Sequence, residues 1–414
     1  MNGISRDFAP PFKLIAPYFL VGSIFYFVSA ISLFFFSADS SYSEMGLIAW
    51  VHLYLLGFVM MIIFGAMAQL VPVVIEVGHA AVDFFYIIYP LLTVGTVMMV
   101  AGFSLVPVLL PFGGLMVLVS MAIFATDLFW TLKRGEHKSI VVSVMGSSNI
   151  FLLLGIMSGF VMALAFGGLL DIDPHHWLKA HVFAVFGGYV ILTIMGLSMV
   201  LLPMFGLSHG FDERPMQWSY RLMLLGVPAV MLGSLVGVTF LEWLGIALVL
   251  VALNSYFYQV YLIFKTRARK ENDVWVKSLF YAYGTLLLSV LFSVVYFFGG
   301  SEAWLMSSGW LLIAGFAGFL ITSHLYKIIP FLVWFERYAP LVGKQKVPML
   351  HEMVPKKQAD AQMVFTASGV SLIAVALLVG SDALFYAGSS AVVVGASYLL
   401  YSVYTMMQYG KEVL

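Results

Sequence analysis

An apolar helix that occurs three times constrains the fold of this chain more than any other part of the sequence. The first copy is Trp50–Pro72 (WVHLYLLGFVMMIIFGAMAQLVP), and the other two end at Pro203 and Pro330. Aligned on the prolines, each copy has a glycine fifteen residues earlier and a small residue seven residues earlier; these are Gly57, Gly188 and Gly315, then Gly65, Gly196 and Ser323. Small residues at fixed positions let helix backbones approach closely. Because the prolines are 131 and 127 residues apart, the pattern predicts an architecture of three similar parts.

Composition places these helices in a membrane. The chain is 62% hydrophobic and only 10% charged, so it has too little polar surface to be a water-soluble protein. Apolar runs of about 20 residues, the length that crosses a bilayer, are twelve in number. They are predicted at 14–36, 47–76, 84–106, 108–131, 140–169, 178–206, 219–240, 243–265, 275–299, 304–334, 362–381 and 384–407. The predicted fold is therefore all-α, a single transmembrane domain over residues 1–414 with three four-helix repeats at about 14–131, 140–265 and 275–407.

The distribution of basic residues predicts the orientation. With a cytoplasmic N-terminus, eighteen of the twenty Lys and Arg residues fall inside, as the positive-inside rule requires. Lys179 falls outside, and Lys327 lies within a span. The inner group is Arg6, Lys13, Lys133, Arg134, Lys138, Arg214, Arg221, Lys265, Arg267, Arg269, Lys270, Lys277, Arg337, Lys344, Lys346, Lys356, Lys357 and Lys411. We expect both termini to be cytoplasmic, in the inner membrane of a bacterium.

Net charge and cysteine content narrow the partners and the chemistry. A net charge of zero, with the basic residues spread over inner loops, gives no sign of nucleic-acid binding. The expected partners are the lipid bilayer and, if the chain carries electrons, other respiratory-chain subunits or an electron donor. The absence of cysteine excludes disulfides and thiolate ligands on this chain. Any redox centre must therefore be held by histidine.

Charged or imidazole side chains within membrane spans tend to mark a pathway or a cofactor. Those predicted within spans are His52, Glu76, Asp127, His181, His324 and Lys327. His52 precedes its proline by twenty residues and His181 by twenty-two, so both lie near the outer boundary at similar depth. Two imidazoles at one level are suited to clamp a haem iron axially. For either histidine alone, the favoured interpretation is a hydrated side chain at the membrane interface. For the two together, ligation of a haem iron is favoured.

His324 lies deeper. It precedes its proline by only six residues, which places it about 21 Å below His52 at the rise of an α-helix. It cannot share an iron with His52 unless the tenth helix is shifted or broken. His324 and Lys327 are three residues apart and lie on one helix face. Three alternative roles are expected for this face: it lines an inner cavity, it binds a haem propionate, or it contacts Glu76. The alternative is a hydrogen-bonded core histidine beside a snorkelling lysine, and for Lys327 this alternative is favoured.

The remaining histidines carry weaker signals. His79 and His209 follow their prolines by seven and six residues, which indicates either duplication or a local cap. His175 and His176, with Asp171 and Asp173, resemble a surface metal site in composition, although exposed acidic loops with histidines are common without metal. We interpret His137 and His351 as solvated. The longest loop, Glu336 to Lys357, is predicted to be an ordered cytoplasmic connector.

The first repeated helix resembles a known family. His52, the glycine-containing helix after it and the ending QLVPVVIEVGH resemble helix 2 of subunit I of the haem–copper oxidases, where a histidine near the outer face ligates the low-spin haem. Twelve helices, an inner N-terminus and three four-helix arcs also resemble that superfamily. The segments HLYKIIPFLVWFERY and GKQKVPML are similar to uncharacterised bacterial proteins grouped with it and with haem-containing nitric-oxide-response membrane proteins. The resemblance implies a haem, of b type, ligated by His52.

The departures from that family shape the functional hypothesis. The oxidases place a His-Pro-Glu motif in helix 6, a histidine pair after it and a His-x-His pair near the start of helix 10. Here helix 6 carries Ala180, His181 and Val182, and Trp304 to Trp310 contains no histidine. No copper centre and no reduction of oxygen to water are therefore expected. His181 or, less easily, His324 would replace the missing second haem ligand.

Two hypotheses of function follow. The first is a haem-binding inner-membrane protein without a copper centre, for electron transfer or for binding of, or response to, a small gas such as nitric oxide. Its ligands would be His52 and His181 at the haem iron, with His324 as a further cofactor-binding residue. The alternative is a transporter or assembly factor for a metal, haem or small solute on the same fold. Inverted repeats, common in secondary transporters, are not evident, which lowers the weight of that alternative.

Overall fold

A computed structural model describes residue 8, residues 10–136 and residues 139–411. Arg6, His137 and Lys138, which the sequence assigned to cytoplasmic segments, lie outside the described residues. The described chain is helical, and its only β-type pairing is an isolated bridge between Ser208 and Arg267. Twelve of its helical spans are long and apolar enough to cross a membrane. The prediction of an all-α, multi-pass protein is thus confirmed.

The twelve spans lie where the apolar runs predicted them. The largest difference is at the eleventh span, which was predicted to begin at 362 and begins at Lys356, because its first turns are polar and escape a hydropathy criterion. The spans are Phe12–Phe35, Met45–Ile75, Val82–Ser104, Leu109–Arg134, Ile140–Phe166, Pro174–Gly206, Arg214–Val236, Thr239–Thr266, Val274–Phe297, Glu302–Arg337, Lys356–Val379 and Asp382–Gln408.

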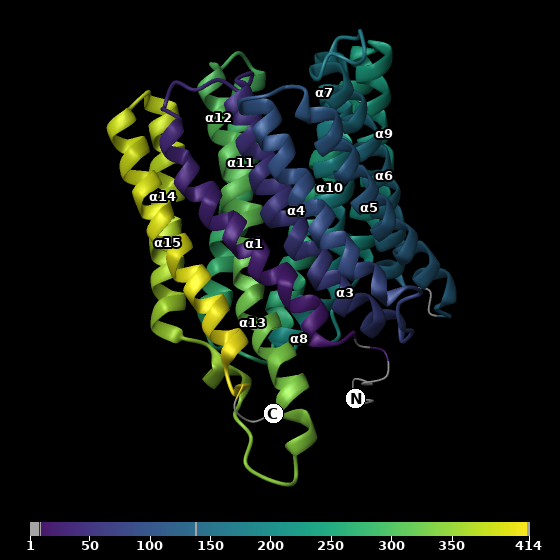
Figure 1. Ribbon diagram of the computed structural model, residues 1–414, viewed down its shortest axis with the longest axis vertical. Helices are drawn as coiled ribbons and strands as arrows, with labels where there is room; N and C mark the ends of the chain where they lie inside the picture. The colour runs from purple at the N-terminus through teal and green to yellow at the C-terminus, as the bar shows by residue number, and fades with distance from the viewer. Residues whose placement is uncertain (1–7, 9, 137–138, 412–414) are drawn as a thin grey trace. The chain divides into compact units, whose positions relative to one another are not determined.

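The helices belong to two compact units. Their order along the chain can be followed by colour in Figure 1. The first unit is Met67–Lys270, and the second is Pro11–Ala66 together with the residues from Glu271 onward. The first contains α3 (Met61–Ile75) from Met67 onward, then η3 (Val82–Phe84), α4 (Phe85–Ser104), α5 (Leu109–Arg134), α6 (Ile140–Phe166), α7 (Pro174–Val182), η4 (Phe183–Ile191), α8 (Leu192–Gly206), α9 (Arg214–Val236) and α10 (Thr239–Thr266).

The second unit joins the start of the chain to its end. Its helix α1 packs against α15, the last helix of the chain. The unit contains α1 (Phe12–Ser32), η1 (Leu33–Phe35), α2 (Met45–His52), η2 (Leu53–Met60), the first residues of α3, α11 (Val274–Phe297), α12 (Glu302–Trp310), η5 (Leu311–Ala317), α13 (Gly318–Arg337), η6 (Ala339–Leu341), η7 (Leu350–Met353), α14 (Lys356–Val379) and α15 (Asp382–Gln408).

Three spans contain the aligned prolines Pro72, Pro203 and Pro330, and only these three are called the proline-containing spans here, although other spans also contain proline. Each of the three changes from α-helix to π-helix and back. The π-helical segments are η2, η4 and η5. They begin nineteen, twenty and nineteen residues before Pro72, Pro203 and Pro330. Long π-helical stretches are rare, and π-bulges occur frequently at functional sites. The same departure from α-helix at the same place in three spans therefore marks this level as one to search for a site.

The repeated glycines lie where the π-helical segments meet a neighbouring helix. A Cβ atom on Gly57 would lie 2.5 Å from Phe25 of α1, and one on Gly188 would lie 2.4 Å from Phe151 of α6. A Cβ on Gly315 would lie 2.7 Å from Thr285 of α11. In each case the partner is on the helix that precedes the glycine's own span. The spacing of these glycines thus reflects three equivalent close approaches between helices.

Three hairpins repeat a second glycine pattern. The pairs α4/α5, α9/α10 and α14/α15 each cross where two glycines face each other. A Cβ on the first glycine would lie 3.0, 2.9 and 2.6 Å from the carbonyl oxygen of the second, in the pairs Gly95/Gly113, Gly226/Gly245 and Gly369/Gly388. A hairpin of this kind follows each proline-containing span. These correspondences are what three related four-helix repeats would produce, and the oxidase-like arrangement of the repeats stays a prediction.

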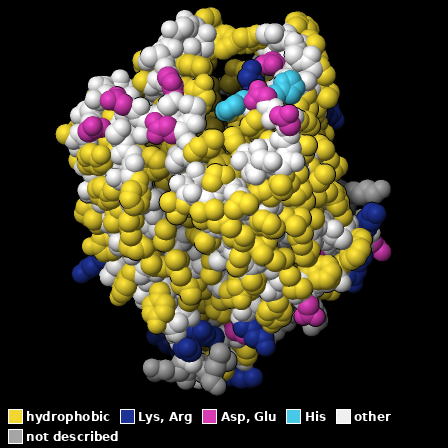
Figure 2. Space-filling view, turned by 45° about the horizontal axis from the view of Figure 1, so that its top comes forward, with side chains coloured by type: hydrophobic (Ala, Val, Ile, Leu, Met, Phe, Trp, Pro, Cys, Tyr) yellow, Lys and Arg dark blue, Asp and Glu magenta, His cyan; other side chains and the backbone are white. Residues whose placement is uncertain are grey.

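Burial singles out the proline-containing spans. In their most apolar windows, 89%, 89% and 72% of residues are buried, against 33% to 50% in the other nine spans. They are therefore the core elements, and the remaining spans present more of their surface outward. Figure 2 shows Asp, Glu and His side chains, with a Lys or Arg among them, at the top of the view, and Lys and Arg together with some Asp and Glu in its lower part. The orientation expected from the positive-inside rule stays a prediction.

Candidate functional site

His52 is the last residue of α2, and η2 begins directly after it. Its Nδ1 donates a hydrogen bond to the carbonyl oxygen of Ile48, 2.8 Å away on the same helix. A carbonyl oxygen can only accept, so the proton of the neutral ring must be on Nδ1 and the lone pair on Nε2. The residue is partly buried. His52 is thus held in the tautomer that allows Nε2 to bind a metal.

His181 reaches the same tautomer through a different neighbour. It is the second-last residue of α7, two residues before the start of η4, and its Nδ1 donates to the carbonyl oxygen of Gly155 on α6 at 2.9 Å. A Cβ on Gly159 would lie 2.7 Å from the imidazole Cε1, so the glycine makes room for the ring. His181 belongs to the first unit and His52 to the second. Each histidine is therefore described by its own contacts.

His324 is buried within α13. Its Nδ1 donates to the carbonyl oxygen of Leu320 at 2.6 Å, and its ring meets the Trp275 ring edge-on with 6.0 Å between centroids. Its exposed fraction is only 6%. This is the most buried of the three predicted cofactor-binding histidines, and its Nε2 again carries the lone pair.

Lys327 has a partner at the end of a neighbouring span. Its side chain is partly buried, and its ammonium donates to Asp273 Oδ2 at 2.6 Å, where α11 begins. That Lys327 snorkels toward the span boundary stays a prediction. The same ammonium lies over the Trp275 ring, 5.4 Å from its centroid. Asp273 is the N-cap of α11 and also accepts from the Val276 amide. The charge of Lys327 is therefore balanced by a carboxylate within the second unit.

The tenth span presents tryptophan where the first repeated span presents His52. Trp310 lies twenty residues before Pro330, and its indole N–H donates to the Val370 carbonyl oxygen at 2.9 Å. It packs against Trp50 with 5.6 Å between ring centroids, and the Trp50 indole N–H donates to the Ser29 carbonyl oxygen. Hydrogen bonding at both indoles fixes this pair. The position that aligns with His52 in α12 is thus a packing residue.

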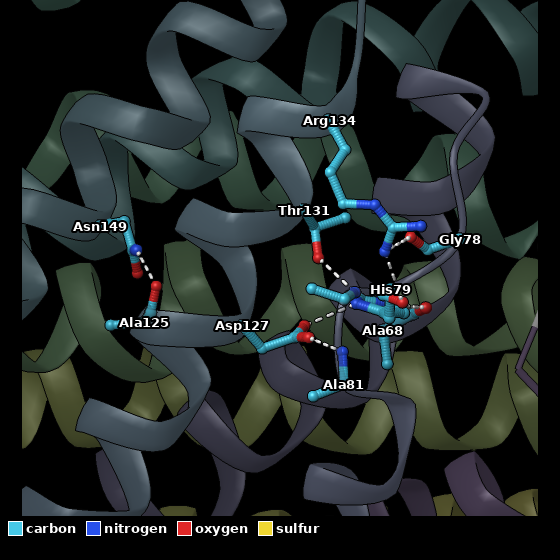
Figure 3. A network of polar contacts seen from close by, with 10 residues as sticks. Ala68, Gly78, His79, Ala81, Ala125, Asp127, Thr131, Arg134 and Asn149 are labelled. Carbon is cyan, nitrogen blue, oxygen red and sulfur yellow. Dashed lines mark hydrogen bonds and ion pairs between the residues drawn. The ribbon is translucent and has the colours of Figure 1, made fainter.

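His79 and Asp127 form a buried pair in the first unit (Figure 3). Nδ1 of His79 lies 2.7 Å from Asp127 Oδ2, and Nε2 lies 2.7 Å from the carbonyl oxygen of Ala68. Both side chains are almost fully buried. Because the carbonyl must accept, Nε2 carries a proton, and a second proton is shared between Nδ1 and the carboxylate. No ring nitrogen of His79 is left to bind a metal.

The contact with Ala68 explains why a histidine stands here. Proline lacks an N–H, so Pro72 leaves the carbonyl oxygen four residues earlier, that of Ala68, without its helical donor. His79 supplies the donor from beyond the end of α3. Asp127 in turn accepts from the Ala81 amide at 2.8 Å. Of the two interpretations of His79, the structure favours the local cap.

Two further predictions were a Glu76 side chain within a span and a surface metal site at His175 and His176. Glu76, predicted within a span, is an exposed residue just past the end of α3, where it adopts a left-handed conformation with φ of 53°. In the first turn of α7, His176 Nε2 lies 3.0 Å from the Leu235 carbonyl oxygen, and Asp173 caps the helix through the His175 amide. Among the described residues, no three His, Asp or Glu side chains gather in a way that would hold a bare metal ion. A haem iron, which takes only two protein ligands, needs no such group.

A scan against models of protein families gave no match, and a search of curated proteins gave none either.

The sequence did not draw attention to three residues that the structure makes prominent. Asp273 could have been found as an N-cap, because it directly precedes an apolar run. Tyr189 and Thr193, whose hydroxyl groups are buried, could have been found by extending the proline alignment to positions that are apolar in the other two copies.

Proposed function

We propose that this chain is a haem-binding, multi-pass protein of a bacterial inner membrane, similar to subunit I of the haem–copper oxidases but without a copper centre. Its role would be electron transfer or the binding of a small gas such as nitric oxide. His52 and His181 would be the axial ligands. The supporting observation is that each donates its Nδ1 proton to a backbone carbonyl oxygen, that of Ile48 or Gly155, and so directs the lone pair of Nε2 outward from that contact.

This arrangement is the usual support of a metal-binding histidine. Ligating imidazoles almost always donate the other ring N–H to a carbonyl or carboxylate, which fixes the tautomer and the ring orientation. A haem held by both histidines would supply reversible one-electron exchange, and it would bind a diatomic gas only where the gas displaces one of the two imidazoles. The chain itself orients the two rings through Ile48 and Gly155, and Gly159 leaves room for the His181 ring.

His324 is kept as a further cofactor-binding candidate. Its ring has the same tautomer and is the most deeply buried of the three. Lys327, by contrast, already pairs with Asp273 at 2.6 Å, which reduces the case for a propionate at that ammonium. The proposal therefore assigns the iron to His52 and His181, and it assigns His324 no axial role.

The test is the reduced-minus-oxidised visible spectrum of the purified full-length protein. We expect the bands of a low-spin haem in the native protein and their loss in both His52→Ala and His181→Ala. His324→Ala should retain them. His209→Ala is the control, because His209 also follows a repeat proline but is exposed. A native protein without haem bands, or a His52→Ala spectrum identical to that of the native protein, would contradict the proposal.

A further inference from the structure

Two buried hydroxyl groups in the sixth span have no partner among the described residues. Tyr189 is near the end of η4, and Thr193 is four residues later in α8. Their exposed fractions are 0% and 2%, and neither Tyr189 Oη nor Thr193 Oγ1 makes a hydrogen bond. Residues four apart lie on the same face of a helix. The sixth span thus carries two unpaired polar groups on one buried face.

Such groups need an explanation, because a buried polar group without a hydrogen bond costs about 1–3 kcal/mol. In native proteins most buried polar atoms have a partner, and exceptions often indicate a water, an ion or a ligand. Another buried tyrosine of the same unit shows the ordinary solution: Tyr256 Oη lies 2.6 Å from Ser198 Oγ.

The other two copies of the span show that the fold does not need these hydroxyls. Tyr189 lies fourteen residues before its proline, where the other copies have Phe58 and Phe316. Thr193 lies ten residues before, where they have Ile62 and Leu320. All four of these apolar side chains are buried. Only the middle copy adds hydroxyl groups, at two positions that apolar side chains fill equally well.

The two glycines just before Tyr189 lie against the helices that flank η4. Gly187 faces Val227 of α9, and Gly188 faces Phe151 of α6. Each further residue rotates the side chain by roughly 100° in an α-helix and by somewhat less in a π-helix. On this geometry the side chain of Tyr189, the next residue, is rotated away from the directions in which Gly187 and Gly188 face.

From these observations we infer that Tyr189 and Thr193 form a binding site for a guest molecule that offers an oxygen atom as hydrogen-bond acceptor. Two sources share this chemistry: a buried water, which needs two or more polar partners, and an oxygen-bearing substituent of a haem. Both hydroxyls would donate to the guest, and the π-helical segment would set the reach of Tyr189. The site stands without the proposed haem; only the second source rests on it.

The direct test is a high-resolution structure of the full-length protein, prepared both with and without haem. We expect non-protein density within hydrogen-bond distance of Tyr189 Oη and Thr193 Oγ1 in the native protein, and its loss in Tyr189→Phe/Thr193→Val. Density in both preparations identifies water, and density only with haem identifies the haem oxygen. An empty space, or an acceptor atom of the chain itself on these hydroxyls, would overturn the inference. A haem spectrum without such density would leave the proposed function intact.

Thermal unfolding gives an independent readout. Tyr189→Phe introduces the side chain that the other two copies carry, so the variant is expected to fold. If a guest is bound, Tyr189→Phe should lower the unfolding temperature as Tyr256→Phe does, because each loses one hydrogen bond. If nothing is bound, Tyr189→Phe should leave that temperature unchanged or raise it, which would contradict the inference. Where the guest is haem, we expect about tenfold weaker haem retention.

Discussion

At the scale of single residues, the histidines are distinguished by what accepts their ring protons. His52, His181 and His324 each donate through Nδ1 to a backbone carbonyl oxygen, so in the neutral ring Nε2 is the unprotonated nitrogen. His79 has acceptors at both ring nitrogens. The first arrangement suits a ligand, and the second suits a structural cap. The sequence shows that a histidine is present, but not which carbonyl oxygen lies beside it.

The first prediction concerns His79→Ala. This change leaves Asp127 buried, with the Ala81 amide as a donor but without the imidazole. It also leaves the Ala68 carbonyl oxygen without a donor. Removing one partner of a buried charged pair typically costs about 3–5 kcal/mol. We therefore expect a loss of that size in the free energy of unfolding, measured in detergent by denaturant titration.

The control for this prediction is His209→Ala, which alters an exposed residue and should change stability by less than about 0.5 kcal/mol. A double-mutant cycle with Asp127→Ala isolates the pair, and residues in contact commonly show coupling of about 0.5–3 kcal/mol. If the two losses simply add, the contact between His79 and Asp127 contributes no coupling, and the loss in His79→Ala comes from the Ala68 carbonyl oxygen alone. A stability of His79→Ala equal to that of the native protein would contradict the cap interpretation.

At the scale of elements, the sequence predicted the helices better than their internal geometry. Apolar length and flanking polar residues were enough to place all twelve spans. The π-helical segments were not predicted, because α- and π-helices share the same residue preferences and the choice between them depends on packing against a neighbour. Gly57 and Phe25 illustrate this: the spacing identified the glycine, but nothing in the sequence identified the phenylalanine that meets it.

The second prediction tests the glycine crossings of the hairpins. In α9/α10, a Cβ on Gly226 would lie 2.9 Å from the Gly245 carbonyl oxygen, and Gly369 meets Gly388 in α14/α15 still more closely. Backbone atoms cannot move aside as a flexible side chain can, so Gly226→Ala and Gly369→Ala should each cost about 1–3 kcal/mol. The measurement is the unfolding temperature in detergent.

The matched control for the crossings is Gly309→Ala in α12, where an added Cβ would meet nothing within 4 Å. Alanine is favoured over glycine within a helix by about 1 kcal/mol, so this variant should be neutral or more stable. Equal losses at Gly309, Gly226 and Gly369 would show that the crossings have no special role.

The third prediction separates the two functions of Asp273. Its Oδ1 accepts from the Val276 amide and caps α11, and its Oδ2 accepts from Lys327. Asp273→Asn keeps a capping oxygen and removes the charge, whereas Asp273→Ala removes both. We expect the alanine variant to be less stable than the asparagine variant by about 1 kcal/mol, the usual value of an N-cap.

The contribution of the Asp273–Lys327 ion pair to stability is measured by repeating Asp273→Asn in a variant that lacks the ammonium. With Lys327→Met, the ammonium is gone, and Asp273→Asn should cost markedly less than it does in the native protein. Unfolding curves of the four proteins give the coupling directly. A cost for Asp273→Asn that is the same in both backgrounds would mean that the ion pair contributes nothing measurable.

At the scale of the whole molecule, the sequence predicted three four-helix repeats, whereas the packing of the helices forms two compact units. The repeated prolines divide the chain into three stretches, yet the compact units divide the first stretch after Ala66 and join its beginning to the end of the chain. The packing of α1 against α15 lies behind this grouping. Such a pairing between distant segments leaves no periodic trace, because either helix could bury its apolar surface against many others.

The last prediction is the orientation in the membrane, which rests on the distribution of basic residues. The chain has no cysteine, so a single introduced thiol reports its own accessibility without background. Lys344 is exposed between α13 and α14, and Asp171 is exposed between α6 and α7. With intact spheroplasts and a membrane-impermeant maleimide, Asp171→Cys should be labelled directly, and Lys344→Cys only after permeabilisation. Ala252→Cys, at a fully buried position of α10, should be labelled in neither state. If Lys344→Cys were labelled in intact spheroplasts and Asp171→Cys were protected, the termini would lie outside, and His52 and His181 would lie near the cytoplasmic boundary.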